Sequence, residues 1–538
     1  MDHLVTCELI GDLPALAAKR WNNRLALVSG EQRWSYREFD QEVRRLTASL
    51  HASGIRQGDK VAVWLTNCPE AEFLFFAVAR TGATIVPLNT RYRTNDLAYA
   101  LRESGSVMLI TMRRSGPVHF DGLLRAALES VELGANNVIR AKGAPALRHI
   151  ISMGGSEIPG ATDWDDFRKR GEGRAVEGGL PAISPLDPAL MVYTSGTTGD
   201  PKGVLLNHSV MRLCHDRCIM MELTGDDVQL TYLPLFHTYA LSYSMIMSFM
   251  CGAHQILMDA FDADTALGLI EEKGVTVVHG FDAHFNDFLL SQKRRSRNIS
   301  SLRFGTMTVG SDASVPLARE VQEKLCPTLS GYGMTEVWGA VTITPQNASL
   351  EQRCEASGLP QPGVEVRVVD VNTGDVLPTG SMGEIHVRSY SRMIGYHNNP
   401  GATAAAVDQD GWFRTGDAGV MRADGHVRYL ARYKDILKVG GENVSPAEVE
   451  GLISTMRGVD CVSVVGQPHE RFQEVPVAFI VAGEDGPSTE EDVIGFCRGK
   501  LASFKIPARV IFVDQLPVTP TGKVQKELLR RRLAAQMS

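Results

Sequence analysis

The stretch YTSGTTGDPKGV, from Tyr193 to Val204, is rich in groups that bind phosphate. Its glycines allow backbone angles that turn N–H groups inward, its hydroxyl side chains add donors, and Lys202 adds a positive charge. It is not a Walker loop, because Pro201 precedes Lys202 and Gly203 follows it. A solvent loop rich in turn formers is the alternative interpretation. The candidate phosphate ligands in the loop are Thr194, Ser195, Gly196, Thr197, Thr198, Gly199 and Lys202.

A second stretch, SGYGMTE from Ser330 to Glu336, places an aromatic face, a hydroxyl and a carboxylate within five residues. Taken alone, Gly331 and Gly333 form a weak dinucleotide fingerprint that lacks its third glycine. A carboxylate together with phosphate oxygens is the usual way in which proteins hold Mg²⁺. A glycine turn followed by a capping Glu is the alternative for this stretch when it is considered by itself.

Three more segments follow in order: GWFRTGDAG (411–419), ARYKDILKVGG (431–441) and PVTPTGKVQK (517–526). Together, the five segments resemble the signature of the adenylate-forming superfamily, and most closely that of its carboxylic acid–CoA ligases. The resemblance runs from about residue 10 to 535. Several motifs in a fixed order over that length are far more specific than any single motif.

The resemblance implies a site for ATP and Mg²⁺. Tyr332 would lie against adenine, Thr335 would contact the α-phosphate side, and Glu336 would hold the metal. Asp417 would accept hydrogen bonds from the ribose hydroxyls, with Arg432 as a further ribose and phosphate ligand. Lys523 would reach the carboxylate and the α-phosphate, where a cation stabilises the charge of two approaching anions. The implied catalytic residues are Lys523, Thr335, Glu336 and His237.

The same resemblance implies CoA as the second substrate and a hinge at Lys434. After rotation about the hinge, Lys438 and the pair Gly440 and Gly441 would face the site for thioester formation. Only hydrogens on these glycines would leave room for the pantetheine arm of CoA.

The segment LPLFHTYA (233–240) carries His237. A lone His beside apolar residues is usually a core His, but here it matches a family position that lines the acyl pocket. The pocket implied by the resemblance also contains Phe281, Val309, Gly310, Ser311 and Trp338. This mixture leaves the small-molecule carboxylate open, because a fatty acid or another small to medium aliphatic, alicyclic, aromatic or thioether-bearing acid would fit.

Three other functions are weighed against the ligase. An amino-acid or aryl-acid adenylation enzyme that loads a carrier protein typically has Asp after Phe in the segment where this chain has His237. A luciferase-like oxygenase shares the motifs. A catalytically silent nucleotide-binding regulator is disfavoured because Glu336 and Lys523 are both retained.

The elements that position these motifs alternate between short apolar runs and helical patterns, which predicts largely parallel, covered sheets. A capping box of Ser35 and Glu38 predicts a helix that ends at Gly54. The strands expected in the first 310 residues are 61–66, 107–111, 189–194, 228–233, 254–258, 275–280 and 304–309. From about Gly363, alternating patterns at 364–370 and 384–389 predict antiparallel strands.

We therefore expect an α/β fold with two domains. Residues 1–430 form the AMP-binding and acyl-binding domain, with mixed and parallel sheets layered with helices and a small β-rich subdomain. Residues 431–538 form a mobile α+β domain with a βαβ-like pattern. In it, Ser445 and Glu448 predict a second capping box, Ser488 predicts a third helix start, and basic residues after 525 predict a solvated helix face.

The composition of the chain argues against some binding partners and indicates a cellular compartment. A net charge of −7 argues against a nucleic-acid binder, which needs a basic face. Residues 228–258 lack Asp, Glu, Lys and Arg, but Pro, His, Gly and Gln interrupt them, so a strand, a buried helix and a strand are expected instead of a membrane span. Nine scattered cysteines and no secretory signal indicate a reduced, cytoplasmic location. The sequence leaves a homodimer open.

Overall fold

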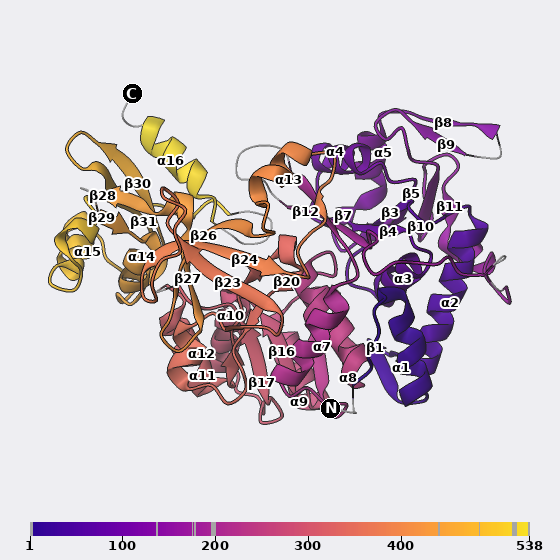
Figure 1. Ribbon diagram of the computed structural model, residues 1–538, viewed down its shortest axis with the longest axis horizontal. Coiled ribbons are helices and arrows are strands. Elements are labelled where there is room, and N and C mark those ends of the chain that lie inside the picture. Colours follow the sequence, from indigo (N-terminus) through magenta and orange to yellow (C-terminus); the bar gives the residue numbers. More distant parts are fainter. Residues whose placement is uncertain are drawn as a thin grey trace.

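The computed structural model describes residues 4–135, 138–174, 176, 179–194, 201–311, 313–439, 442–483, 485–518 and 524–535. Two sheets, covered by helices, make up most of the chain, and a smaller body at the C-terminal end lies beside them (Figure 1). This is the expected α/β architecture.

The first sheet has seven strands and is parallel except at its edge pair. The order across it is β18 (Thr328–Leu329), β17 (Phe304–Met307), β16 (Val277–Gly280), β14 (Val228–Thr231), β15 (His254–Leu257), β1 (Leu25–Ser29) and β2 (Gln32–Ser35). The carboxyl ends of β14, β16 and β17 lead into the segments that carry His237, Phe281 and Val309.

The second sheet has eight strands and is antiparallel only where β12 meets β13 and β13 meets β25. Its order is β11 (Thr162–Asp163), β10 (His149–Met153), β5 (Met108–Met112), β3 (Lys60–Trp64), β4 (Thr84–Pro87), β12 (Leu190–Thr194), β13 (Lys202–Leu206) and β25 (Gly395–Tyr396). Strand β5 is buried throughout, because helices cover both faces. The seven strands expected before residue 310 are all present.

The helices that cover these sheets are mostly amphipathic. They are α1 (Leu13–Trp21), α2 (Tyr36–Ala52), α3 (Pro69–Arg80), α4 (Thr94–Ser104), α5 (Phe120–Leu128), α6 (Trp164–Lys169), α7 (Val210–Met220), α8 (Met247–Cys251), α9 (Ala263–Lys273), α10 (Asp282–Arg294), α11 (Val315–Lys324), α12 (Leu350–Glu355) and α13 (Pro400–Ala406). The predicted capping box of α2 is confirmed: the Ser35 side chain accepts from Glu38 N–H, and Glu38 Oε2 accepts from Ser35 N–H at 2.8 Å.

The uncharged segment 228–258 is confirmed as strand, buried helix and strand. A π-helix at Ala240–Ile246 continues into α8 between β14 and β15, and all its residues are buried. Among the described residues, no helix is both long and apolar enough to span a bilayer.

A four-stranded antiparallel sheet forms the expected β-rich subdomain. It consists of β23 (Val364–Val369), β24 (Met382–Ser389), β26 (Phe413–Met421) and β27 (Val427–Arg432), in that order. Residues Asp417 and Arg432 lie opposite each other on β26 and β27. Short ribbons complete this half of the chain: β6 (Arg114–Ser115) with β7 (Val118–His119), β8 (Val131–Leu133) with β9 (Ile139–Ala141), β19 (Gly333–Met334) with β20 (Gly339–Ala340), and β21 (Thr342–Ile343) with β22 (Leu359–Pro360).

The C-terminal body has its own sheet and its own core. Its strands are β28 (Leu437–Val439), β29 (Glu442–Val444), β30 (Val459–His469), β31 (Gln473–Ala482) and β32 (Arg509–Phe512), with helices α14 (Pro446–Ser454), α15 (Glu490–Cys497) and α16 (Lys526–Ala535). Strand β32 pairs in parallel with β31 after the α15 crossover. The large hydrophobic cluster ends at Val427 and that of the C-terminal body begins at Leu437, while a small cluster of Ala418, Ala431 and Ile436 joins the segments on both sides of residue 431. The domain limit at residue 431 stays a prediction.

Two helix caps of this body differ from expectation. Ser445 begins α14, but its side chain caps no N–H of a described residue: the Glu448 N–H donates to the Ser445 carbonyl at 3.2 Å, and the Glu448 carboxylate is held by Lys505 Nζ at 2.6 Å. Helix α15 is capped by Thr489 with Asp492, one residue later than Ser488.

The basic helix α16 is anchored and not simply solvated. Lys526 forms an ion pair with Glu450 at 2.7 Å, and Arg530 forms one with Asp435 at 2.6 Å. The second pair ties the last helix to the segment just after the predicted hinge.

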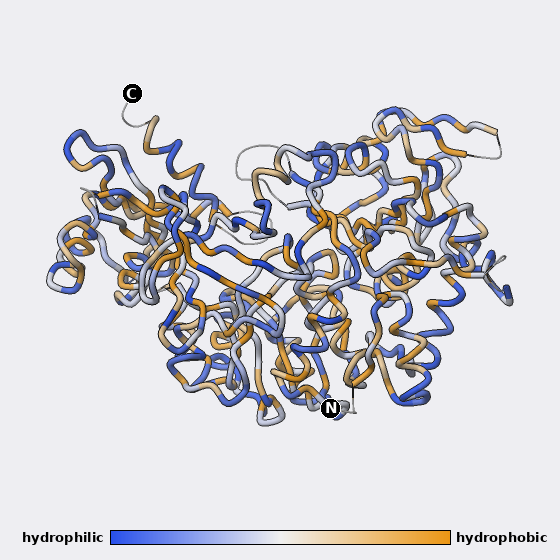
Figure 2. The backbone as a smooth tube through the Cα atoms, viewed as in Figure 1, coloured by the Kyte–Doolittle hydropathy of each residue, from blue (hydrophilic) through white to orange (hydrophobic). Residues whose placement is uncertain are grey.

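The hydropathy of the chain follows this layering (Figure 2), with apolar residues concentrated in the sheets and polar residues on the outer helices. All nine cysteines are free; six are buried as small apolar residues are, two are half-buried, and Cys461 is exposed. Among the described residues, no cluster of His, Cys, Asp and Glu forms a metal site.

Candidate active site

Tyr332, Asp417 and Arg432 meet in one buried polar cluster. The Tyr332 hydroxyl donates to Asp417 Oδ2 at 2.8 Å, and Arg432 Nε lies 3.1 Å from Asp417 Oδ1. Arg432 Nη1 also donates to the Thr415 carbonyl at 3.2 Å. The antiparallel register of β26 and β27 aligns Asp417 with Arg432, while β18 leads into the Tyr332 motif.

The charges of this cluster follow from its burial. Burial disfavours the charged Arg432 guanidinium, but Asp417, Tyr429 and other neighbours outweigh this effect, so the pKa of Arg432 is raised. Burial and the Asp417 carboxylate raise the pKa of the Tyr332 hydroxyl well above its usual value. Tyr332 therefore remains a neutral donor beside an ionised pair. The Tyr429 ring stacks on Tyr332 at a centroid distance of 6.0 Å.

The glycines on both sides of Tyr332 are required by close backbone packing. A Cβ on Gly331 would lie 2.6 Å from the Thr342 carbonyl oxygen, and a Cβ on Gly333 would overlap the Gly339 carbonyl. The motif therefore brings its backbone against β20 and the following strand, and directs Thr335 and Glu336 into the short helix Thr335–Val337.

Glu336 and Lys202 are linked through a residue that sequence reasoning missed. The Tyr396 hydroxyl donates to Glu336 Oε1 at 3.0 Å, while Lys202 Nζ lies 4.8 Å from the centre of the Tyr396 ring. Strand β25 carries Tyr396 alongside β13, which begins at Lys202. Lys202, at the end of the predicted phosphate loop, and the carboxylate of the SGYGMTE motif therefore both contact the Tyr396 side chain.

Glu336 fits a magnesium ligand. Its Oε1 is oriented by Tyr396, and Oε2 forms no hydrogen bond with any described residue. A half-buried carboxylate with a free oxygen, next to a Lys at the end of a phosphate loop, is the donor set that Mg²⁺ and a polyphosphate require. The Thr194 side of the loop lies opposite Lys202 in the β12–β13 register.

His237 is half-buried and neutral. Its Nδ1 accepts the Tyr239 N–H at 3.2 Å, so the ring carries its proton on Nε2. Burial lowers the pKa of His237 to about 4. The Phe281 ring, which is partly exposed at the start of α10, lies edge-on to it at 6.3 Å.

The other predicted acyl-pocket residues differ in burial and in the segments that they contact. Val309 N–H donates to Ser330 Oγ at 2.9 Å, which joins its segment to the SGYGMTE motif. Gly310 has a φ of +141° and packs against Tyr429, and Ser311 is half-buried beside Ser314. Trp338 is fully buried in the core, and its Nε1 donates to the Asn207 carbonyl at 2.8 Å. Its assignment to the pocket remains a prediction.

The predicted hinge residue Lys434 is exposed on a short 3₁₀ turn directly after Arg432. It lines a cavity of about 490 Å³ together with Arg432, Glu384 and Arg414. Lys438 is exposed, and its N–H donates to Glu474 Oε2 at 2.9 Å. The remaining predicted site residues lie outside the described residues: Ser195, Gly196, Thr197, Thr198, Gly199, Gly440, Gly441 and Lys523.

Tyr396 and Tyr429 are the site residues that motif reading did not single out. Tyr396 ends the run SRMIGY and Tyr429 lies in HVRYLAR, where alternating polarity indicates only a strand. Their contacts depend on pairing between strands that are far apart in the sequence, and the local residue spacing does not predict such pairing.

The chain belongs to the family of AMP-binding enzymes. The model of the AMP-binding enzyme family matches residues 15–397, and that of the AMP-binding enzyme C-terminal domain matches residues 448–523. The chain is 33% identical to the putative acyl-CoA synthetase YngI of Bacillus subtilis, covering 97% of this chain and 96% of the relative. It is 32% identical to a feruloyl-CoA synthase of an Amycolatopsis species, covering 97% and 99%. Its structure is similar to that of ATP-bound MatB from Rhodopseudomonas palustris, with a TM-score of 0.84, 29% identity, and coverage of 97% of this chain and 98% of the other.

Proposed function

We propose that the protein is an ATP-dependent, AMP-forming carboxylic acid–CoA ligase. In the first step a carboxylate oxygen attacks the α-phosphate of ATP, the bond to pyrophosphate breaks, and acyl-AMP forms. In the second step the thiol of CoA loses its proton and attacks the acyl carbon, and AMP leaves. The observation that carries the proposal is the prearranged cluster of Tyr332, Asp417 and Arg432 next to Tyr396, which contacts both Glu336 and Lys202.

In the first step, each end of ATP has its own contacts. Tyr332 and Asp417 hold the adenosine, and the loop from Thr194 to Lys202 holds the β- and γ-phosphates. Thr335 and Lys523 meet the charge that develops around the α-phosphate. Bound at Glu336, Mg²⁺ would neutralise phosphate charge.

In the second step, the body after residue 431 rotates about Lys434. The rotation removes Lys523 and brings Lys438, Gly440 and Gly441 to the acyl-AMP. Lys434 is exposed on the segment that links the two largest hydrophobic clusters, and this exposure supports the role. His237 acts at the acyl end as a neutral donor through Nε2.

We propose acids of small to medium size as substrates, and we place the reaction in a reducing compartment such as the cytoplasm. Nine free cysteines support this location. The oligomeric state, with a homodimer as one option, is a question for solution scattering or ultracentrifugation.

The decisive experiment incubates the protein with ATP, Mg²⁺, CoA and a panel of carboxylic acids. AMP, pyrophosphate and an acyl-CoA should appear in equal amounts. Release of ADP and phosphate would refute the mechanism. Replacing CoA with a pantetheine-bearing carrier protein tests the alternative acceptor, because a preference for the carrier would indicate a loading enzyme.

A further inference from the structure

Helix α7 carries a charged group in the interior that the proposed reaction does not explain. Arg217 is 0% exposed. Its Nη1 donates to Ser242 Oγ at 3.3 Å and its Nη2 to the Ala340 carbonyl at 2.6 Å, while Nε has no hydrogen-bond partner. Among the described residues, no carboxylate forms a salt bridge with Arg217. A buried cation without a counter-ion is costly, so its retention needs a reason.

The Arg217 cation also lies over the face of the Tyr243 ring. The guanidinium carbon of Arg217 lies 4.0 Å from the ring centre. A cation on the face of a phenol attracts electron density from it and makes the hydroxyl a stronger hydrogen-bond donor. Burial raises the pKa of Tyr243, and Arg217 opposes this rise.

The Tyr243 hydroxyl has no hydrogen-bond partner among the described residues, although the side chain is only 3% exposed. The neighbouring Tyr239 shows the contrast. Its ring is 4.8 Å from that of Tyr243, but its hydroxyl is paired with Thr306 Oγ1 at 2.6 Å. Because no described residue accepts from it, the Tyr243 hydroxyl is available to donate a hydrogen bond to a bound molecule.

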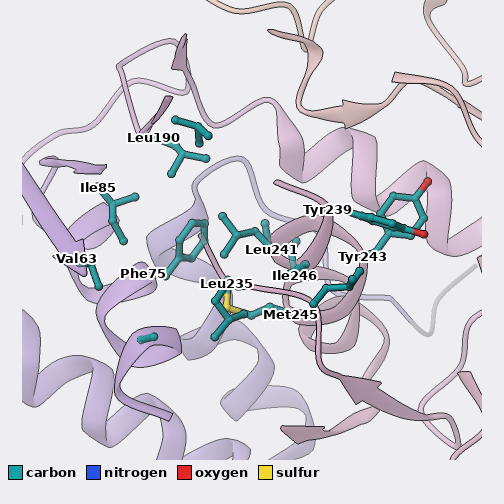
Figure 3. Packing of buried hydrophobic residues seen from close by; sticks show 14 of the residues in the cluster. Val63, Phe75, Ile85, Leu190, Leu235, Tyr239, Leu241, Tyr243, Met245 and Ile246 are labelled. Carbon is teal, nitrogen blue, oxygen red and sulfur yellow. The ribbon is translucent and has the colours of Figure 1, made fainter. Parts of the chain in front are cut away.

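This donor faces the acyl side of the nucleotide motif. A Cβ placed on Gly331 would lie 3.3 Å from the Tyr243 oxygen and 3.2 Å from Ala340 Cβ. In Figure 3 the two tyrosines stand together at one end of the buried cluster, and their oxygens point away from Leu241 and Ile246. An acyl group lying over Gly331 would therefore meet the Tyr243 hydroxyl.

We infer that Tyr243, polarised by Arg217, selects acids that carry an oxygen acceptor, such as a ketone, hydroxyl or second carboxylate, at the far end of the acyl group. This inference rests on the proposed function. Tyr243 would contact the substrate, and Arg217 would be a positioning residue that acts through the Tyr243 ring. A purely aliphatic chain leaves the donor unpaired and is a poorer substrate.

The test compares acids that differ by a single oxygen. Suitable pairs are phenylpropanoate with hydroxyphenylpropanoate, cyclohexylpropanoate with its ring ketone, and a straight-chain acid with the keto acid of equal length. The parent protein should prefer the oxygenated member of at least one pair by about tenfold in kcat/KM. In Tyr243→Phe that preference should vanish, while the rate with the acid that lacks the oxygen is retained.

Tyr239→Phe is the matched control, because it removes a hydroxyl that is already paired; the preference should persist in it. Arg217→Met should also reduce the preference, and Tyr243→Phe decides the matter if Arg217→Met does not fold. The inference is overturned if Tyr243→Phe still prefers the oxygenated acid, or if the parent protein uses both acids of every pair at equal rates. Neither result would contradict the proposed ligase activity. Failure of every acid to release AMP overturns both.

Discussion

The nucleotide end and the acyl end of the site handle charge in opposite ways. At the proposed nucleotide end, Asp417 and Arg432 form a salt bridge, and one oxygen of Glu336 has no hydrogen bond to any described residue. At the proposed acyl end are His237 and His284, which lies on α10 with its ring 5.9 Å from that of Phe281. Both are neutral, because burial lowers the pKa of each to about 4. Charges are retained at the proposed polyphosphate contacts, whereas the two imidazoles at the proposed acyl end lose theirs; the cation near that end, Arg217, lies behind the Tyr243 ring.

The arrangement of backbone contacts explains this contrast. Both imidazoles accept a backbone N–H at Nδ1, from Tyr239 at 3.2 Å and from Phe281 at 3.1 Å. A second proton on Nδ1 would point at these N–H groups, so each ring remains neutral. At the nucleotide end, Arg432 lies opposite Asp417 on the adjacent strand, so each charge has its partner in place before ATP binds.

The largest effect is expected from removing the charge at the nucleotide end. In Asp417→Asn, Arg432 loses its counter-charge and the ribose loses an acceptor, so kcat/KM for ATP in ATP–pyrophosphate exchange should fall about 100-fold. The KM for the acid should change little. Asp424→Asn is the control, since Asp424 pairs with Arg422 at 3.3 Å away from the site. Equal losses in both variants would count against a role for Asp417.

The sheet beneath the acyl end offers the next test. Glu72 on α3 is fully buried against Gln255 Nε2 at 3.2 Å, and burial raises its pKa to about 8. An unfolded Glu ionises near pH 4.5, so the folded state loses stability as pH rises from 4.5 towards 8. Glu72→Gln should have little effect at pH 4.5 and should stabilise by roughly 1–3 kcal/mol at pH 8. Melting curves at the two pH values measure this. A gain that does not grow with pH would show that Glu72 is ionised in the fold.

A smaller loss is expected from Tyr396→Phe. The variant keeps the ring beneath Lys202 but removes the hydroxyl that orients Glu336. The Mg²⁺ concentration for half-maximal adenylation should rise about tenfold, since a hydrogen bond to a carboxylate is lost. Tyr390→Phe is a close control, because Arg212 lies 4.2 Å from the Tyr390 ring while no described residue accepts a hydrogen bond from the Tyr390 hydroxyl. An unchanged magnesium requirement in Tyr396→Phe would mean that Glu336 does not depend on this contact.

The sequence predicted the strands and the family, but not the contacts between distant segments. Apolar runs of four to six residues identified β3, β5 and β12, because strands covered on both faces are continuously apolar. The capping box at Ser35 could be predicted because its two residues, Ser35 and Glu38, are only three positions apart in the sequence. The equally good pattern at Ser445 forms no such box, and the Glu448 carboxylate is held by Lys505, 57 residues further on. Tyr396 was missed for the same reason: its role depends on the pairing of β25 with β13.

The smallest expected effect is the absence of a pH response at the acyl end. With a pKa of about 4, His237 should produce no inflection in kcat/KM for the acid between pH 6 and 8. Below the ordinary pKa of 6.5 the unfolded chain binds a proton that the folded chain refuses, so stability should fall as pH drops from 6.5 towards 4. His237→Gln should reduce that fall. An inflection near 6.5 that disappears in His237→Gln would show a solvated imidazole, and the acyl end would then carry charge as the nucleotide end does.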